Sequence, residues 1–319
     1  MATAEQLKSL IRSHFSNEME RFSTIALQVA AHEAQQGHVA LATEIRELID
    51  KERYRKSQMA PSVSQELSGL VRKENRETPK SALVVPDSLN VRLERIIHEY
   101  RQRNKLKAHG LEHRRKILLI GPPGTGKTMT ARVLAKELHL TLRTIQVDRL
   151  VTKFMGESSA KLRQIFDLIQ RDHGIYLFDE FDAIGGERSV DNDVGEMRRV
   201  LNAFLQFIDQ DESESLIVAA TNNPKLLDSA LFRRFDDVLY YQHPGSEERQ
   251  HLIENILGVY MGQRFSWQKI IAASEGLSHA EIDNACRDAI KSAILCDKDK
   301  VVVIELLKNI EDRHNYFKD

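Results

Sequence analysis

The sequence lacks three features that mark large classes of proteins: a cysteine framework, a net charge and a long apolar run. Only Cys286 and Cys296 occur, both in one predicted helix, so a disulfide scaffold is excluded and reduced, buried thiols are expected. The 46 Lys and Arg residues balance 47 Asp and Glu residues, which removes any global attraction to nucleic acid or to an anionic membrane. No apolar run could span a membrane, and residues 1–5 lack the features of a secretory signal. We therefore expect a cytoplasmic protein without a membrane partner.

Glycine gathers in one loop that matches the pattern G-x-x-x-x-G-K-[ST]. The loop comprises Gly121, Pro122, Pro123, Gly124, Thr125, Gly126, Lys127 and Thr128. It lies between a predicted buried strand, residues 116–120, and a predicted helix that begins at Met129. Such a turn aims backbone N–H groups and the positive end of a helix at one point, where a polyphosphate can bind. Lys127 would then reach the β- and γ-phosphates, and Thr128 would ligate Mg²⁺. The alternative, a glycine-rich turn that carries a lysine by chance, is disfavoured by the strand and helix on either side.

A second predicted strand, residues 175–180, ends in two carboxylates. Because successive side chains of a strand point to opposite faces, Asp179 can hold the Mg²⁺ shell while Glu180 polarises an attacking water. The structural alternative, that the acids only cap the following helix, fits Asp182 better than either of them.

The first 57 residues form a separate unit in this interpretation. Residues 5–54 contain no proline, and apolar residues recur at helical spacing on both sides of Gly37, which predicts a helical hairpin over residues 1–57. The hairpin either recruits a partner or substrate, or packs on the main body, and its periodicity does not separate these alternatives. Residues 58–84 have the composition of a linker with one short helix at most.

A basic segment follows the linker. Residues 91–107 read as a helix that Gly110 stops, and residues 101–116 hold seven Lys or Arg but a single acid, Glu112. This segment could contact nucleic acid, but no aromatic residues are interleaved for base stacking, and a charged helix face is usually only solvated. A nucleic-acid partner is therefore not expected.

Three motifs in order resemble the AAA family of ATPases. They are the phosphate loop, the strand that ends in Asp179 and Glu180, and a strand over residues 216–220 that leads to Asn222 and residues 224–236. The resemblance covers about residues 85–319. It implies an α/β P-loop domain, residues 85–243, with a parallel sheet between two layers of helices, followed by an all-helical lid, residues 244–319. It also implies ATP and Mg²⁺ as ligands and a homo-oligomeric, hexameric ring.

The same resemblance assigns roles to individual residues. Glu180 would activate water, and Asn222 would be the first sensor of the γ-phosphate. The segment Lys153, Phe154, Met155 and Gly156 resembles the pore loop with which such hexamers grip a polypeptide, and residues 185–193 would form a second pore loop. If Phe154 instead closed over the core, that role would be wrong.

The sequence departs from the family's pattern at two places. Family members complete each site with an arginine from the neighbouring subunit, but here Arg233 and Arg234 are adjacent, and either or both could reach across. The lid segment Ser278–Glu281 resembles the family's Ser-Gly-Ala-Asp turn near the nucleotide, with His279 in place of Gly before Ala280. His279 would contact ribose or phosphate, or face solvent. No arginine stands at the position of the second sensor.

These residues support three hypotheses for the work done. The first is ATP-driven remodelling of proteins threaded past Phe154. No H-E-x-x-H protease motif is present, so any proteolysis would need a partner protease. The chain also resembles small bacterial or mobile-element ATPases encoded beside a subtilisin-like protease. The second hypothesis is a nucleotide-gated switch that controls a partner without threading, and the third is DNA remodelling through residues 101–116.

Overall fold

The computed structural model describes residues 8–11, 13, 19–36, 38, 41–46, 49, 67, 69–74, 78–153, 157–185, 191–224, 229–262 and 265–315. The chain divides into two compact units, Met1–Ser64 and Gln65–Asp319. Each unit is described by itself below.

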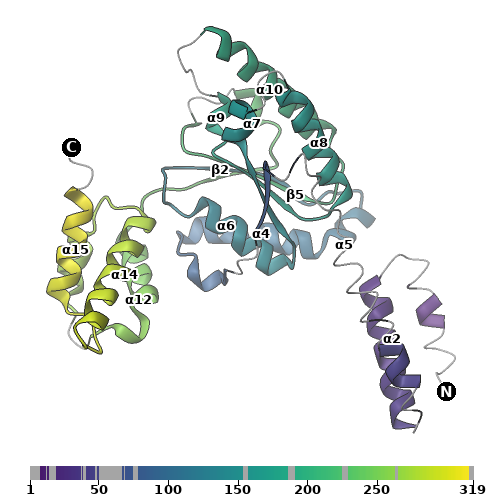
Figure 1. The fold of residues 1–319 in the computed structure, drawn as a ribbon, viewed down its shortest axis with the longest axis horizontal. Helices are drawn as coiled ribbons and strands as arrows, with labels where there is room; N and C mark the ends of the chain where they lie inside the picture. The colour runs from purple at the N-terminus through teal and green to yellow at the C-terminus, as the bar shows by residue number, and fades with distance from the viewer. Residues whose placement is uncertain are drawn as a thin grey trace. The chain divides into compact units, whose positions relative to one another are not determined.

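The described part of the first unit is helical. Helix α2, Met19–Gln35, buries Ala26, Val29 and Ala30 on one face, as the spacing of apolar residues predicts. Residues 41–46 are also helical, and Ala42 is buried there. Figure 1 shows α2 as the longest purple helix. The pairing of these helices as a hairpin stays a prediction.

The second unit is built on one six-stranded sheet in the order β1-β3-β4-β5-β2-β6. All neighbouring strands run parallel except β1, which pairs antiparallel with β3. The strands are β1 (Val71–Glu74), β2 (Lys116–Ile120), β3 (Leu142–Gln146), β4 (Ile175–Asp179), β5 (Leu216–Thr221) and β6 (Asp237–Tyr240). Because β2 lies beside β5, and β5 beside β4, the carboxyl ends of these three strands meet at one edge of the sheet. Ligands bind at this edge in open α/β sheets.

Helices cover both faces of the sheet, as β4 illustrates. Ile175 and Leu177 belong to a core shared with α4 (Asp87–Arg101) and α6 (Lys127–Leu138). Tyr176 and Phe178 alternate with them and are also fully buried. The ring of Phe178 packs against rings from α8 (Ser158–Arg171) and α10 (Asp191–Gln210), which cover the other face in Figure 1. The fold class predicted from the sequence, a parallel P-loop sheet between helices, is confirmed.

Shorter helices complete the α/β region: α5 (Arg103–Ala108), α7 (Val147–Lys153), α9 (Asp182–Gly185) and α11 (Ser229–Phe232). The helix predicted from residue 91 begins earlier, at Asp87 after Pro86, and gives way to α5 at Gln102. Strands β1 and β6 were not expected. Strand β1 lies inside the predicted linker and has the sequence Val-Arg-Lys-Glu, which lacks the alternation of apolar and polar residues typical of a strand. Its conformation is therefore determined by its pairing with β3.

The last part of the unit is all-helical, as predicted. Its elements are α12 (Ser246–Leu257), the 3-10 turn η3 (Gly258–Tyr260), α13 (Trp267–Ala273), α14 (His279–Leu295) and α15 (Val303–Asn315). These helices share a core of their own, with Trp267 packed against it. Cys286 is buried in that core, but Cys296 caps the end of α14 and is exposed. The expectation of two buried thiols is therefore wrong for Cys296, because the helix ends one residue before it.

Within the described residues, no helix is long and apolar enough to cross a membrane.

Candidate nucleotide-binding site

The glycine-rich loop joins the end of β2 to the start of α6. Gly124 and Gly126 have φ angles of 73° and 98°, in the left-handed region that favours glycine. Gly121 is required for another reason: a Cβ atom there would lie 2.4 Å from the backbone oxygen of Tyr241. The turn predicted from the sequence is therefore present, with α6 beginning at Lys127 rather than at Met129.

Lys127 lies inside this loop with only 7% of its surface exposed. Its Nζ donates hydrogen bonds of 2.7 Å to the backbone oxygens of both Gly121 and Pro122. Burial lowers the pKa of the ammonium, and the carboxylates of Asp179 and Asp182 oppose that shift. The ammonium is thus held in the loop by two carbonyls, where phosphate oxygens can compete for it.

Thr128 and Asp179 meet at the same edge of the sheet. The Thr128 hydroxyl donates to Asp179 Oδ2 over 3.0 Å, and Asp179 Oδ1 accepts from the backbone N–H of Glu180 over 3.1 Å. No group of three or more His, Cys, Asp or Glu side chains forms a metal cage within the described residues. A hydroxyl and one carboxylate do fit Mg²⁺, which takes oxygen ligands and usually completes its shell with substrate phosphates and water.

Glu180 follows Asp179 in a strained conformation. Its φ angle is 52°, which is uncommon for a residue with a side chain. Phe181 fixes the turn through its backbone and its side chain: its N–H donates to Ala220 O over 2.9 Å, and its ring is fully buried. The turn leaves the Glu180 side chain exposed at the mouth of the site. A carboxylate in this position can accept a proton from water or orient it.

Asn222 follows β5, next to the turn after β4. Its backbone N–H donates to Asp182 Oδ1 over 3.3 Å, and its side chain is exposed. Asp182 begins α9, and its carboxylate secures the loop after β5, whereas the helix-capping role that the sequence favoured for it stays a prediction.

One cavity of about 640 Å³ brings the predicted residues together. Its phosphate end is lined by the glycine-rich loop from Pro123 onward, together with Asp179, Glu180 and Asn222. Its other end is largely apolar and lies between the segment before α4 and two lid helices. That end is lined by Ala82, Leu83, Val84, Leu252, Asn255, Ile256, His279, Asp283, Arg287 and Ile290, and Ala280 lines the cavity where the lid meets the phosphate loop. A polar end beside an apolar end fits a nucleotide, with its phosphates on the loop and its base against the apolar wall.

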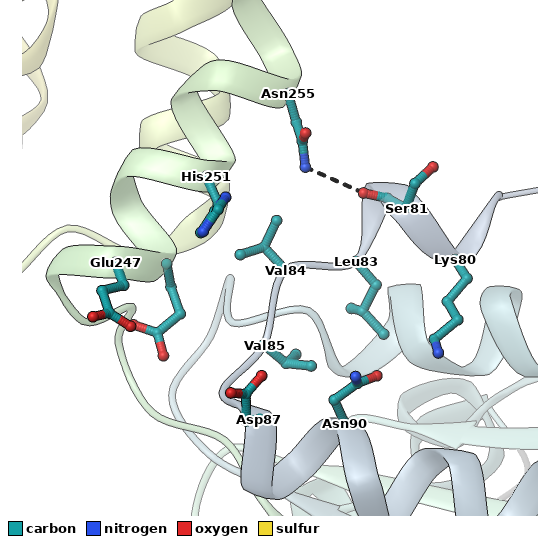
Figure 2. Close-up of a pocket in the computed structure, with 11 residues that line it drawn as sticks. Lys80, Ser81, Leu83, Val84, Val85, Asp87, Asn90, Glu247, His251 and Asn255 are labelled. Carbon is teal, nitrogen blue, oxygen red and sulfur yellow. Dashed lines mark hydrogen bonds between the residues drawn. The ribbon is translucent and has the colours of Figure 1, made fainter.

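The segment of residues 80–85, which we call the strap, contacts both the α/β core and the lid. Leu83 and Val85 pack on the core of the α/β region, whereas Val84 between them packs on the core of the lid. The Asn255 side chain on α12 donates to Ser81 O over 3.2 Å, drawn as the dashed line in Figure 2. The sequence assigned residues 80–84 of this segment to a linker and residue 85 to the P-loop domain. In the structure it forms one wall of the cavity.

The lid also contacts the phosphate loop directly. The Ala280 N–H donates to Gly124 O over 3.0 Å, and a Cβ atom on Gly124 would lie 2.7 Å from Ser278 Oγ. Ser278 and Glu281 form a reciprocal capping box that fixes the start of α14 at this contact. The phosphate loop and the lid are therefore joined through backbone atoms.

Sequence reasoning missed Asp283, Arg287 and Ile290, which line the cavity along one face of α14. They follow Ala280 at spacings of three to four residues, and this helical spacing was the signal available. Arg287 Nε bonds Asp283 Oδ2 over 2.6 Å, which raises the pKa of the guanidinium. An arginine of α14 thus lines the cavity, although none stands at the family's second-sensor position.

Arg233 and Arg234 do not line this cavity. Arg234 Nε bonds Asp209 Oδ2, on α10, over 2.7 Å. Arg233 is exposed, and among the described residues no carboxylate forms an ion pair with it. Phe154, Met155 and Gly156 lie outside the described residues, as do residues 186–190 of the second predicted pore loop. Lys153 is described only as the last residue of α7.

This sheet order and this cavity define a class: an α/β enzyme whose glycine-rich loop after a parallel strand binds a nucleoside triphosphate. The sequence profile described as "ATPase family associated with various cellular activities (AAA)" matches residues 117–243. An uncharacterized AAA family ATPase, y4kL of Sinorhizobium fredii, is 31% identical over 98% of this chain and 93% of its own length. The chain belongs to the AAA family, and it is an ATP-hydrolysing enzyme.

Other relatives share only part of their length with this chain. A proteasome-activating nucleotidase of Methanopyrus kandleri is 33% identical over 63% of this chain and 48% of its own length. The ATP-dependent zinc metalloprotease FtsH 1 of Methylacidiphilum infernorum is 30% identical over 70% of this chain and 37% of its own length. The chain therefore spans about half the length of these relatives, or less. The crystal structure of the FIGL-1 AAA domain superposes with a TM-score of 0.63 at 23% identity, covering 79% of this chain and 91% of that one, which shows the fold.

Proposed function

We propose that the chain is one subunit of a homo-oligomeric ring, a hexamer, that uses Mg²⁺-dependent ATP hydrolysis to remodel or unfold proteins. The observation that carries the proposal is the single cavity that gathers the phosphate loop, Asp179, Glu180 and Asn222. Relatives named as a proteasome-activating nucleotidase and an ATP-dependent metalloprotease support a protein substrate and a partner protease. A subtilisin-like partner is the form of this proposal that the sequence resemblance favours.

Each residue has a part in the proposed reaction. Lys127 and the loop N–H groups bind the β- and γ-phosphates, and Thr128 and Asp179 hold Mg²⁺, which neutralises phosphate charge when bound. Glu180 orients the attacking water and accepts its proton, while Asn222 hydrogen-bonds the water or the γ-phosphate. Release of the γ-phosphate shifts the loop, and the bond from Ala280 to Gly124 passes this shift to the lid.

The two adjacent arginines take different parts. Arg233 is the finger that reaches the site of the neighbouring subunit, because it is exposed and no described carboxylate holds it. Arg234 positions the segment through its ion pair with Asp209. Both lie outside their own chain's cavity, as a group that acts in trans must.

The testing experiment measures ATPase activity per subunit against protein concentration, with Lys127→Ala as the blank. Mixtures of Glu180→Gln and Arg233→Ala subunits then test whether sites are completed in trans. A mixed ring contains some interfaces with an intact Glu180 on one side and an intact Arg233 on the other, so activity should recover on mixing. A flat, slow rate that no mixture rescues would contradict the ring.

The strap favours a second candidate function, a nucleotide-gated switch. Because the strap lines the cavity and bonds α12, nucleotide binding alone could move the lid and change a partner's state. Phe154→Ala separates the candidates. A threading enzyme should lose substrate processing and keep basal hydrolysis, whereas a switch should keep its partner response.

A further inference from the structure

The lid histidine His279 contributes two covered ring nitrogens, of which the described structure satisfies one at most. Nδ1 and Nε2 are each almost wholly covered, and the Val84 backbone is the described group that can hydrogen-bond the ring, which leaves at least one ring nitrogen without a partner among the described residues. Buried ring nitrogens normally have partners, and an unpaired one in a cavity calls for an explanation. The alternative considered from the sequence was a histidine that faces solvent, and the covered nitrogens do not fit it.

The ring lies beside apolar residues of the strap and the lid that line the cavity. His279 is the first residue of α14, and its ring is close to the backbone of Val84 in the strap. Leu83, Leu252 and Ile256 line the same cavity.

Burial keeps the ring neutral, which suits it to hydrogen-bond a neutral partner. Desolvation lowers the pKa of His279; the nearby Glu248 carboxylate and Val84 backbone favour the charged form, and His243 disfavours it. A neutral imidazole presents one N–H donor and one acceptor nitrogen. Ribose hydroxyls and the nitrogens of a purine offer matching groups, whereas phosphate oxygens would favour a charged ring.

We propose that His279 hydrogen-bonds the nucleoside half of the bound nucleotide, through a sugar hydroxyl or a base nitrogen. This inference rests on the proposed nucleotide site. It assigns to this chain a polar contact that the glycine of the family's turn has no side chain to make.

The test is calorimetric binding of ADP to the full chain. His279→Phe keeps a ring but removes both nitrogens, and His251→Phe, the same change on neighbouring α12 outside this cavity, is the matched control. His279→Phe should weaken ADP binding about two- to twelve-fold, the worth of one hydrogen bond, and His251→Phe should not. His279→Gln, which retains polar atoms, should recover part of the loss.

ADP analogues that each lack one sugar hydroxyl or one base nitrogen then locate the contact. For the analogue that lacks the partner atom, wild type and His279→Phe should bind alike. Unchanged ADP binding in His279→Phe, an equal loss for every analogue, or an equal loss for inorganic pyrophosphate would each overturn the proposal. If His279→Phe proves unfolded by circular dichroism, His279→Gln and the analogue series on wild type decide. The nucleotide site itself fails separately, if Lys127→Ala binds ADP as tightly as wild type.

Discussion

The two ends of the parallel strands both gather charged residues, but they use them differently. At the amino ends, Arg115 before β2 pairs with Asp211 before β5, and both side chains are nearly inaccessible, at 9% and 0%. Arg143 at the start of β3 likewise pairs with Asp172 before β4. At the carboxyl ends, no ion pair of described residues involves Asp179 or Glu180. The charged residues at the amino edge pair with one another and stabilise the fold, whereas the carboxylates at the carboxyl edge stay available to bind a ligand.

This comparison also explains the basic segment of residues 101–116. Five of its seven basic residues are paired with the chain's own carboxylates: Arg101 with Glu137, Arg103 and Lys107 with Glu214, Arg114 with Glu99, and Arg115 with Asp211. Their positive charge is largely neutralised where it lies. The structure therefore gives no support to the DNA-remodelling hypothesis, and it favours the solvated, ion-paired interpretation.

The largest effect is expected at the exposed arginine. Arg233→Ala should lower kcat by about 10³- to 10⁵-fold if Arg233 is the trans-acting finger. Arg234→Ala should lower kcat less than Arg233→Ala does, because Arg234 only positions the segment that carries Arg233. Asp209→Ala, which removes the ion-pair partner of Arg234, should lower kcat by about as much as Arg234→Ala. Steady-state ATPase assays at saturating protein concentration measure both. Equal losses in Arg233→Ala and Arg234→Ala would show that the two arginines act together.

The second-largest effect is expected for Glu180, the carboxylate in the strained turn after β4. Glu180→Gln keeps the shape of the side chain but cannot accept a proton, so hydrolysis should fall about 10²- to 10⁴-fold while ATP binding stays intact. Single-turnover hydrolysis and equilibrium ATP binding separate the two. Asp182→Asn serves as the control, because that carboxylate accepts a backbone hydrogen bond beside the site. A Glu180→Gln chain that hydrolyses ATP normally would remove Glu180 from the reaction.

The buried pair at the amino edge should matter for stability rather than for catalysis. Asp211→Ala leaves the Arg115 guanidinium buried without its carboxylate, which should lower the free energy of unfolding by about 3–5 kcal/mol. Activity per folded molecule should not change, because Asp211 lies at the far ends of the strands. Denaturant melts and ATPase assays on the same sample test both halves. A specific loss of activity without a loss of stability would break the comparison between the edges.

Local pattern determines the phosphate loop, and the sequence therefore predicted it with its strand and helix. The carboxylates after β4 were predicted for the same reason. The strap was not, because Val84 and its neighbours pack on two separate cores that only the tertiary structure defines. The distinction between Arg233 and Arg234 depends on Asp209, which lies on a different helix. No spacing rule relates those residues, so the sequence left the two arginines equivalent.

A smaller effect concerns a histidine at the amino edge. Burial lowers the pKa of His113, with help from Arg115 and Arg103, and its Nε2 is covered and unpaired within the described residues. The unfolded chain therefore binds a proton near its ordinary pKa of about 6.5, before the folded chain does. Stability from His113 is present above that pH and is lost as the pH falls below it. Thermal melts at pH 8 and pH 5.5 should differ less in His113→Phe than in wild type.

The smallest effect is expected for the exposed basic residues of the same segment. The Lys107 Nζ lies 3.6 Å from a Glu214 carboxylate, and the lysine side chain is 79% exposed, so Lys107→Ala should change stability by less than about 0.5 kcal/mol. Binding to a DNA duplex, measured by fluorescence anisotropy at low salt, should be absent in wild type and unchanged in the variant. Salt-dependent binding that Lys107→Ala weakens would reverse the assignment of this segment, because the pairing with Glu214 would then yield to phosphates. The amino edge would in that case be a second binding surface. Both ends of the sheet would then bind a ligand, and they would differ only in which ligand they bind.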